Sequence, residues 1–171
     1  MANASSPFYN DDHHAFRESV RQFTEKELTP HVHQWDLDGE IPLELYKMAA
    51  EIGIFGDGFD AEFGGHGQRD AILRMVMLQE LARAGSGGLI ASLLSNYIGL
   101  SPIQRFGSDA TKARVLTPCL AGDAISALAI TEPGGGSDVA RITTTARRDG
   151  SHYVVNGSKT FITSGMRANY I

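Results

Sequence analysis

The period of the hydrophobic pattern changes near residue 123, and this change limits the folds that the chain can adopt. Between residues 16 and 120, apolar residues recur every three or four positions, as they do along helices that are buried on one face. In residues 141–147, Ile142, Thr144 and Ala146 alternate instead with Thr143, Thr145 and Arg147, which is the period of a β-strand. The pattern therefore predicts an α+β multidomain chain, with a helical domain over residues 1–123 and the start of a β domain over residues 124–171.

The region of helical period carries start and stop signals for five or six helices. Pro30 is expected to divide the first helix, because proline lacks the backbone N–H that continues a helix. Pro42 is predicted to begin another helix, and Gly53 is typical of the position just after a helix ends. The fold expected for this region is therefore an all-α helical bundle.

Two later helices and one loop are expected in the same region. The buried face of one helix is predicted to contain Ile72, Met75, Val76 and Gln79. Ser108 is a typical N-cap, and Pro118 is expected to shorten the helix that follows it. The segment GDGFDAEFGGHG at residues 56–67 is rich in glycine, which favours a flexible joint over regular structure.

The region of alternating period contains two signals for tight turns. Asp149-Gly150 and Asn156-Gly157 are typical hairpin dipeptides. They predict an antiparallel meander, preceded by a buried strand with the sequence SALAI. This meander would be the first part of a truncated β-barrel-like domain, because three strands alone are only marginally stable. The predicted strands cover residues 126–130, 141–147, 153–155 and 159–163.

The segment TEPGGGSD at residues 131–138 raises the question of a phosphate-binding loop. A dinucleotide fingerprint requires a helix after the glycines, whereas the residues that follow here alternate with period two. An NTPase loop would end in Gly-Lys-Ser/Thr, which is absent from this segment. Two interpretations stay open: an anion-binding nest to which Ser137 adds a hydroxyl, and a mobile surface loop in which Asp138 caps its own backbone.

Charge, cysteine content and the absence of targeting patterns limit the partners and the cell compartment that we expect. The net charge is -5, so nucleic acid is not expected as a partner, because phosphate binding requires a basic surface. Cys119 is the only cysteine, which suits a reducing compartment. The N-terminus has neither a secretory nor a transit pattern, and the apolar segment 89–100 is too short to cross a bilayer. We therefore expect a cytoplasmic protein with no membrane span.

The histidine pairs do not predict a metal site. His13 and His14 are adjacent, and His31 and His33 are two positions apart. Neither pair has the i, i+4 spacing that places two imidazoles on one helix face. We expect these histidines to be solvated or part of the core, and we assign no metal ligand.

The string ALAITEPGGGSDVARITTTARRDGSHYVVNGSKTFITSG at residues 127–165 resembles the signature region of the acyl-CoA dehydrogenases. The segment EIPLELYKMAAEIGIFG at residues 40–56 is similar to the N-terminal helical domain of that family. The resemblance covers nearly the whole chain and implies a helical domain, a middle β domain and a second helical domain. It also implies FAD as the cofactor, held between the last two domains.

The resemblance implies roles for particular residues. Backbone groups at the strand end, together with the Thr131 hydroxyl, would bond the polar edge of the flavin. Ser137 would touch both the FAD pyrophosphate and the acyl-CoA substrate. A triplet would lie beside the ring, with Thr163 donating toward the N5 region and with Phe161 where the family often has tryptophan. The implied cofactor-binding residues are Leu128, Ala129, Ile130, Thr131, Ser137, Phe161, Ile162 and Thr163.

The resemblance also implies a reaction, which is α,β-desaturation of an acyl-CoA with hydride transfer to FAD N5. The catalytic base of the family is a glutamate beyond residue 171, so we assign no catalytic residue and expect these residues alone to be inactive. Glu132 matches a structural position. The implied partners are acyl-CoA and an electron-transfer flavoprotein, and the full-length protein would be a homotetramer.

Alternatives to this function remain open. One is an acyl-CoA oxidase or a flavin monooxygenase on the same scaffold, and another is a non-catalytic helical module that binds acyl-CoA or protein. The apolar stripe around Leu93 and Tyr97 is expected to be core. A further hypothesis is that the small residues Ser95 and Gly99 set the acyl chain length.

Overall fold

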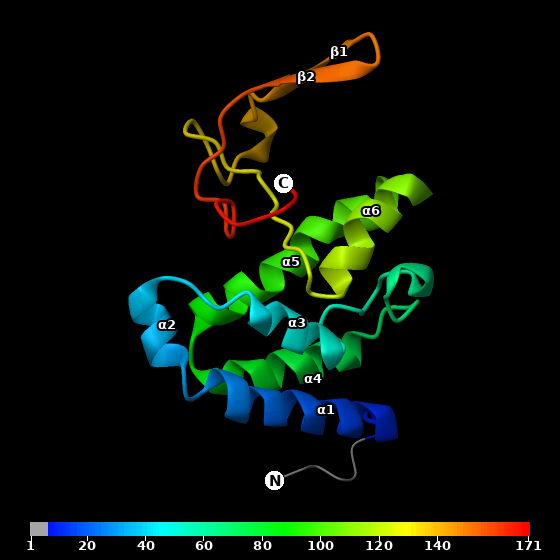
Figure 1. Ribbon diagram of the computed structural model, residues 1–171, viewed down its shortest axis with the longest axis vertical. Helices are drawn as coiled ribbons and strands as arrows, with labels where there is room; N and C mark the ends of the chain where they lie inside the picture. Colours follow the sequence, from blue (N-terminus) through cyan, green and yellow to red (C-terminus); the bar gives the residue numbers. More distant parts are fainter. Residues whose placement is uncertain (1–6) are drawn as a thin grey trace.

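The computed structural model describes residues 7–171, in which six α-helices precede a two-stranded antiparallel hairpin (Figure 1). This order of elements confirms the predicted fold class. Residues 1–6, which begin the N-terminal stretch examined above for targeting signals, lie outside the described residues. The main elements are α1 (Asp11–Phe23), α2 (Val32–Asp38), α3 (Glu44–Glu51), α4 (Ala71–Leu81), α5 (Gly87–Phe106), α6 (Asp109–Leu120), β1 (Thr145–Asp149) and β2 (His152–Asn156).

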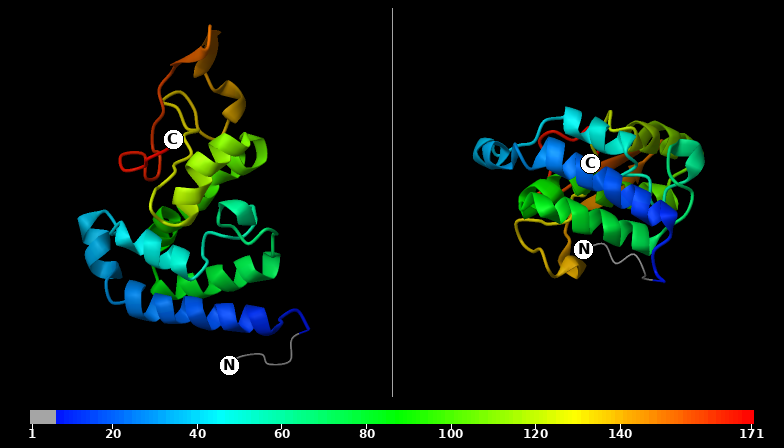
Figure 2. Two further views of the ribbon diagram at one scale, coloured as in Figure 1. Left: turned by 45° about the vertical axis from the view of Figure 1, so that its right-hand side comes forward. Right: turned by 90° about the horizontal axis from the view of Figure 1, so that it is seen from below.

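The helices form one end of the molecule and the hairpin forms the other (Figures 1 and 2). Helices α1 and α4 pack side by side at the helical end, and α5 packs against α6 nearer the hairpin. The core lies between the helices and includes the fully buried side chains of Tyr46, Phe55, Leu93 and Leu116. Within residues 7–171, no helix combines the length and apolar character needed to span a bilayer.

Pro30 divides the first helical segment, as predicted. Helix α1 continues into a π-helical turn at Thr24–Leu28, and α2 begins only after the proline. The start of α1 is stabilised by a reciprocal cap, in which the Asn10 side chain accepts from the His13 amide at 2.9 Å and His13 Nδ1 accepts from the Asn10 amide at 3.1 Å. Such caps satisfy backbone donors that a helix start leaves free.

A buried carboxylate joins α1 to α4. Glu80 accepts hydrogen bonds from Arg17 at 3.0 Å and from Arg21 at 3.0 Å through two nitrogens. The Arg21 guanidinium lowers the pKa of the Glu80 carboxyl, outweighing the opposing effect of burial. The predicted face of α4 was partly wrong: Val76 is buried, but Met75 is exposed and Glu80 faces the interior.

The glycine-rich segment 56–67 is an ordered loop, so the predicted flexible joint was wrong. Phe59 and Phe63 are buried in it, and a short 3-10 helix spans Ala61–Phe63. A Cβ on Gly65 would lie 2.1 Å from the Phe59 carbonyl oxygen. Glycine is therefore required there by close backbone approach, because no larger residue fits that space.

Helix α6 runs two residues beyond Pro118, so the expected shortening does not occur. Proline has no N–H with which to bond the carbonyl four residues earlier, which here belongs to Arg114. The Tyr170 hydroxyl donates to that carbonyl at 3.0 Å instead. A partner from a distant segment thus satisfies the acceptor that Pro118 leaves free.

The β region contains one hairpin where a three-stranded meander was predicted. Strands β1 and β2 pair from Thr145 with Asn156 to Asp149 with His152, around the turn that contains Gly150. In the SALAI segment, Ser126 forms only an isolated parallel bridge with Tyr170.

The predicted third strand at residues 159–163 is absent from the described residues. Phe161 has a positive φ angle of 55°, and Ser164, three residues later, has one of 62°. Positive φ angles interrupt extended backbone. The hairpin signal at residues 156–157 therefore does not produce a second hairpin.

Candidate functional site

A buried amide fixes the start of the segment that leads to the candidate site. Asn96, on α5, is fully buried and its Oδ1 accepts from the Ser126 amide at 2.9 Å. The Ser126 hydroxyl donates to the Asn96 carbonyl at 2.8 Å. Asn96 also donates to the Cys119 carbonyl at 2.9 Å, at the end of α6. These bonds hold residue 126 against both helices, and the chain emerges from there toward residues 128–131.

Residues 128–131 form a partly exposed stretch whose backbone N–H groups have no acceptor among the described residues. Leu128 and Ile130 are 37% and 38% exposed, and Ala129 and Thr131 are partly buried between them. Among residues 7–171, none of the four backbone N–H groups of this stretch has a protein acceptor. Unused donors beside apolar side chains can bond the polar edge of a planar ligand.

Glu132 ties the glycine loop to the segment that precedes β1. The carboxylate accepts from the Thr143 amide and hydroxyl at 2.8 and 2.6 Å, and from the Thr144 amide at 2.9 Å. The Thr144 hydroxyl and the Lys159 ammonium also donate to it. The base of the loop is closed by paired backbone bonds between Glu132 and Gly135, at 3.0 and 3.1 Å.

These donors determine the chemistry of Glu132. The Thr143 hydroxyl, followed by the Thr144 hydroxyl, holds the pKa of the buried carboxyl well below its usual range. A general base needs a pKa near the working pH and a free approach to its substrate. Glu132 has neither, so it is a structural residue.

A second pair of contacts brings residues 159–163 beside Thr131. The Thr160 amide donates to the Thr131 carbonyl at 3.0 Å, and Lys159 Nζ donates to the Ile130 carbonyl at 2.8 Å. The glycine loop also lies close to Thr131: a Cβ on Gly136 would be 3.5 Å from the Thr131 methyl group. Segments 131–136 and 159–163 therefore lie side by side (Figure 1).

The eight residues implied by the resemblance lie on these segments. Phe161 is 91% exposed, Thr163 is exposed and Ile162 is half-buried. Ser137 is exposed on the glycine loop, next to Gly136. Among residues 7–171, the hydroxyls of Thr131, Ser137 and Thr163 have no hydrogen-bond partner. The structure brings the Thr131 and Phe161–Thr163 segments together through the Thr160 bond, while Ser137 is linked to them through Gly136.

Several residues that support this site were not found by sequence reasoning. Lys159 and Thr160 were noted only as parts of motifs, although they join the two segments. Asn96 carried no signal beyond being a polar residue within an apolar helix, which is a mild indication of a buried hydrogen-bond network. The proposed cap by Asp138 is not seen, because the short helix at Val139–Arg141 has no side-chain cap.

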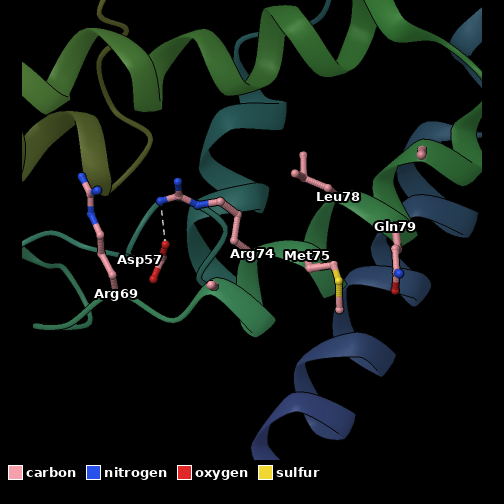
Figure 3. Close-up of a pocket in the computed structure, with 8 residues that line it drawn as sticks. Asp57, Arg69, Arg74, Met75, Leu78 and Gln79 are labelled. Carbon is pink, nitrogen blue, oxygen red and sulfur yellow. Dashed lines mark hydrogen bonds and ion pairs between the residues drawn. The ribbon is translucent and has the colours of Figure 1, made fainter. Parts of the chain in front are cut away.

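A separate cavity of about 670 Å³ lies beside α4, at the helical end of the molecule (Figure 3). Arg74, one of its polar residues, donates to Asp57 at 2.8 Å, and its guanidinium lies 4.5 Å from the centre of the Tyr97 ring. Met75 and Leu78 line the apolar side. Arg74 and Asp57 are thus already paired within the protein, and the cavity is remote from residues 128–163.

The histidines singled out in the sequence have ordinary structural positions. His13 is buried, and its Nε2 lies 2.8 Å from Asp70 Oδ2. His14 and His31 are exposed. Within the part of the chain that the structure describes, no three His, Cys, Asp or Glu residues are grouped so that they could hold a metal ion.

The fold and the site define a class of protein in which a helical domain leads into a β segment. The backbone N–H groups of residues 128–131 in that segment are free to bond a ligand. The sequence matches the family profile of the acyl-CoA dehydrogenase N-terminal domain over residues 10–123. It matches the middle domain of the same family over residues 127–171. The chain belongs to the acyl-CoA dehydrogenase family, whose members depend on FAD.

Individual relatives agree with this assignment. The chain is 37% identical to a 3-(aryl)acrylate reductase of Clostridium sporogenes, over 91% of this chain and 41% of the relative. An acyl-CoA dehydrogenase structure from Geobacillus kaustophilus has a TM-score of 0.86 and 37% identity, covering 98% of this chain and 44% of that one. The structure of a glutaryl-CoA dehydrogenase of Mycobacterium smegmatis in complex with FADH2 has a TM-score of 0.84 and 33% identity. The match covers 96% of this chain and 42% of that one.

The chain spans about two fifths of the length of the curated relatives it matches. The rest of their length has no counterpart in these 171 residues.

Proposed function

We propose that the complete polypeptide is an FAD-dependent acyl-CoA dehydrogenase that desaturates an acyl-CoA thioester at its α,β bond. The observation that supports this most directly is the wall formed by residues 128–131 and 161–163. It combines exposed apolar side chains with unused backbone donors and free hydroxyls. An isoalloxazine ring needs an apolar face and hydrogen bonds along one polar edge, and these residues fit that requirement.

In this proposal each part of the wall has a separate task. The N–H groups of residues 128–131 and the Thr131 hydroxyl bond the pyrimidine edge of the ring. The Thr163 hydroxyl donates toward N5, and Ser137 contacts the pyrophosphate and the acyl-CoA. Phe161 covers the ring without the indole donor that tryptophan would supply. FAD, when bound, supplies the acceptor for the β hydride.

Glu132 is not the base that removes the α proton, because its carboxylate is committed to Thr143, Thr144 and Lys159. We propose that a carboxylate in the part of the polypeptide beyond residue 171 performs this step. The proposal also includes a homotetrameric assembly and an electron-transfer flavoprotein as the acceptor of electrons.

The experiment is a desaturation assay of the complete polypeptide with acyl-CoA substrates of increasing chain length and an artificial electron acceptor. Because one relative is named a 3-(aryl)acrylate reductase, reduction of arylacrylates is assayed in parallel. Oxygen consumption without the acceptor would instead favour an oxidase or monooxygenase. Absence of bound FAD and of activity at all chain lengths would refute the proposal.

A matched pair of variants tests the wall itself. Thr163→Val keeps the shape of the side chain but removes the hydroxyl, and removal of a donor at a developing charge reduces kcat by about a hundredfold or more in other enzymes. Thr145→Val makes the same change at an exposed position of β1 and is expected to leave kcat unchanged.

A further inference from the structure

A turn with left-handed backbone follows the triplet that contains Thr163. Ser164 has a φ angle of 62°, a conformation that is unfavourable for a residue with a side chain. The turn is closed by amides of Arg167 and Ala168, which donate to the Ser164 carbonyl at 3.0 and 2.8 Å. Because Ser164 directly follows Thr163, this turn fixes the chain on one side of Thr163, and the bond from the Thr160 amide to the Thr131 carbonyl fixes it on the other.

A buried hydroxyl on α5 contacts this turn. Ser95 is 6% exposed, and its Oγ lies 3.1 Å from Ser164 Oγ. Ser95 Oγ also donates to the Ser92 carbonyl at 2.8 Å. A serine hydroxyl has a single proton to donate, so Ser164 is the donor and Ser95 the acceptor. Among the described residues, this is the only side-chain hydrogen bond that links α5 to residues 159–168.

Helix α5 is a rigid reference for this contact. Its neighbouring residue Asn96 is bonded to Ser126 and to the end of α6, so the Ser95 hydroxyl has a fixed position. By contrast, Thr163 itself is exposed and has no hydrogen-bond partner among residues 7–171. The turn is held by the Ser95 contact together with the hydrogen bonds between Asn169 and Ile125 and the placement of the Arg167 guanidinium over the Tyr46 ring.

We infer that Ser95 is a positioning residue, which holds the left-handed turn at Ser164 and thereby sets the place of Thr163 at the flavin wall. The flavin part of this inference rests on the proposed function. Ser95 does not touch the ring, and its effect passes through Ser164. This role of the Ser95 hydroxyl is separate from the hypothesis that Ser95 and Gly99 set the acyl chain length, which stays a prediction.

The first test uses the chain without FAD and measures hydrogen exchange of the turn. Ser95→Ala removes the acceptor and is expected to speed exchange of the Arg167 and Ala168 amides about three- to tenfold, the equivalent of one ordinary hydrogen bond. Ser95→Thr keeps the hydroxyl and is expected to restore slow exchange. The matched control is Ser101→Ala on the same helix, whose hydroxyl bonds only to the Tyr97 carbonyl within residues 7–171.

The pairing is tested independently from the other side of the contact. Ser164→Ala removes the donor, and the double variant with Ser95→Ala is expected to exchange no faster than either single variant, because all three lack the same bond. Additive effects, or unchanged exchange in Ser95→Ala, would overturn the inference.

The second test uses the complete polypeptide with FAD bound. Ser95→Ala is expected to change the visible spectrum of the flavin, lower its reduction potential and reduce kcat more than it changes KM, while Ser101→Ala alters none of these. An unchanged flavin spectrum and potential would refute the role of Ser95 at the flavin. A complete polypeptide that binds no FAD would refute the proposed function, while the exchange experiment would still decide whether Ser95 holds the turn.

Discussion

The carboxylate of Glu132 joins three segments that are separate in the sequence. Its oxygens accept from Thr143 and Thr144 before β1, and from Lys159 after β2. Lys159 in turn donates to the Ile130 carbonyl. A buried carboxylate is stable only when hydrogen bonds replace the water it has lost, and here those bonds also tie the glycine loop to the segment that precedes β1. Glu132 thus acts on the candidate site through the position of its neighbours.

Glu132→Gln is expected to lower the midpoint of thermal unfolding, because an amide offers one acceptor where the carboxylate offers two. Its NH₂ group would face donors from Thr143 or Thr144. The matched control is Glu62→Gln, which changes an exposed glutamate that has no hydrogen bond in the structure. Equal midpoints for the two variants, measured by circular dichroism, would contradict the structural role of Glu132.

The same residue predicts a pH dependence. The pKa of Glu132 is depressed in the folded chain, whereas in the unfolded chain it is near the ordinary value of about 4.3. The stabilisation is therefore complete above that value and is lost as the pH falls through and below it, because the unfolded state then binds the proton more readily. Denaturant unfolding at several pH values should show a smaller acid loss in Glu132→Gln than in the unaltered chain.

Helix α5 is the element that connects the bundle to the candidate site. It carries Asn96 and Ser95, which bond Ser126 and Ser164 respectively. Gly99, one turn further along, lies against the same segment: a Cβ there would be 2.6 Å from the Ser126 hydroxyl oxygen and 3.3 Å from the Ala127 carbonyl carbon. The small size of Gly99 therefore permits close contact between helix and chain.

Gly99→Ala is expected to destabilise the chain by about 1–3 kcal/mol, the usual cost of overpacking a well-filled contact. Gly88→Ala is the matched control in the same helix, since the nearest atom to its added Cβ is 3.9 Å away. Alanine there should stabilise by up to about 1 kcal/mol through helix propensity. The free energies of unfolding in urea give both values, and equal stabilities would rule out the proposed contact.

At the scale of the whole molecule, the helical end is a packed core and the hairpin end is open. The buried hydrophobic cluster lies within residues 20–125, in the helices and in the loops that join them, whereas Phe161, Tyr153 and Met166 are largely exposed. These three side chains are therefore not part of the buried core. The relatives are more than twice as long as this chain, which agrees with a site that needs further residues for completion.

The 171-residue chain is accordingly expected to bind FAD weakly or not at all. It supplies one wall of the proposed cleft, and a cofactor that is left exposed on its other face loses most of its contact area. Fluorescence titration with FAD measures the affinity, with the complete polypeptide as the positive comparison. A dissociation constant in the micromolar range or tighter for the 171-residue chain would contradict this expectation.

Local sequence signals predicted some features of the fold and missed others. Helix existence, the break at Pro30 and the hairpin at Gly150 follow from local rules, because caps, prolines and turn dipeptides act within a few residues. The buried face of α4 did not follow, because Glu80 is buried by two arginines of α1. No pattern within α4 itself records that pairing.

The candidate site was predicted by motif and only partly by physics. The exposed triplet and the free hydroxyls agree with the roles implied by the resemblance, and those roles stay predictions. The prediction of a third strand at residues 159–163 was wrong, because the alternation of side chains does not reveal the positive φ angles at Phe161 and Ser164. The ordered loop at residues 56–67 was missed for a related reason: its glycines are required by contacts with distant backbone.

The sequence by itself determined the two hydrophobic periods, the helix break at Pro30, the N-cap at Ser108 and the motif order, since each depends on residues that are close together along the chain. Only the tertiary structure decided which free groups find partners across long separations. Tyr170 satisfies the carbonyl that Pro118 leaves open, Thr160 pairs with Thr131, and Ser95 meets Ser164. The Ser95 hydroxyl is buried and must be bonded, and in all three contacts the available partner is set by how the segments pack.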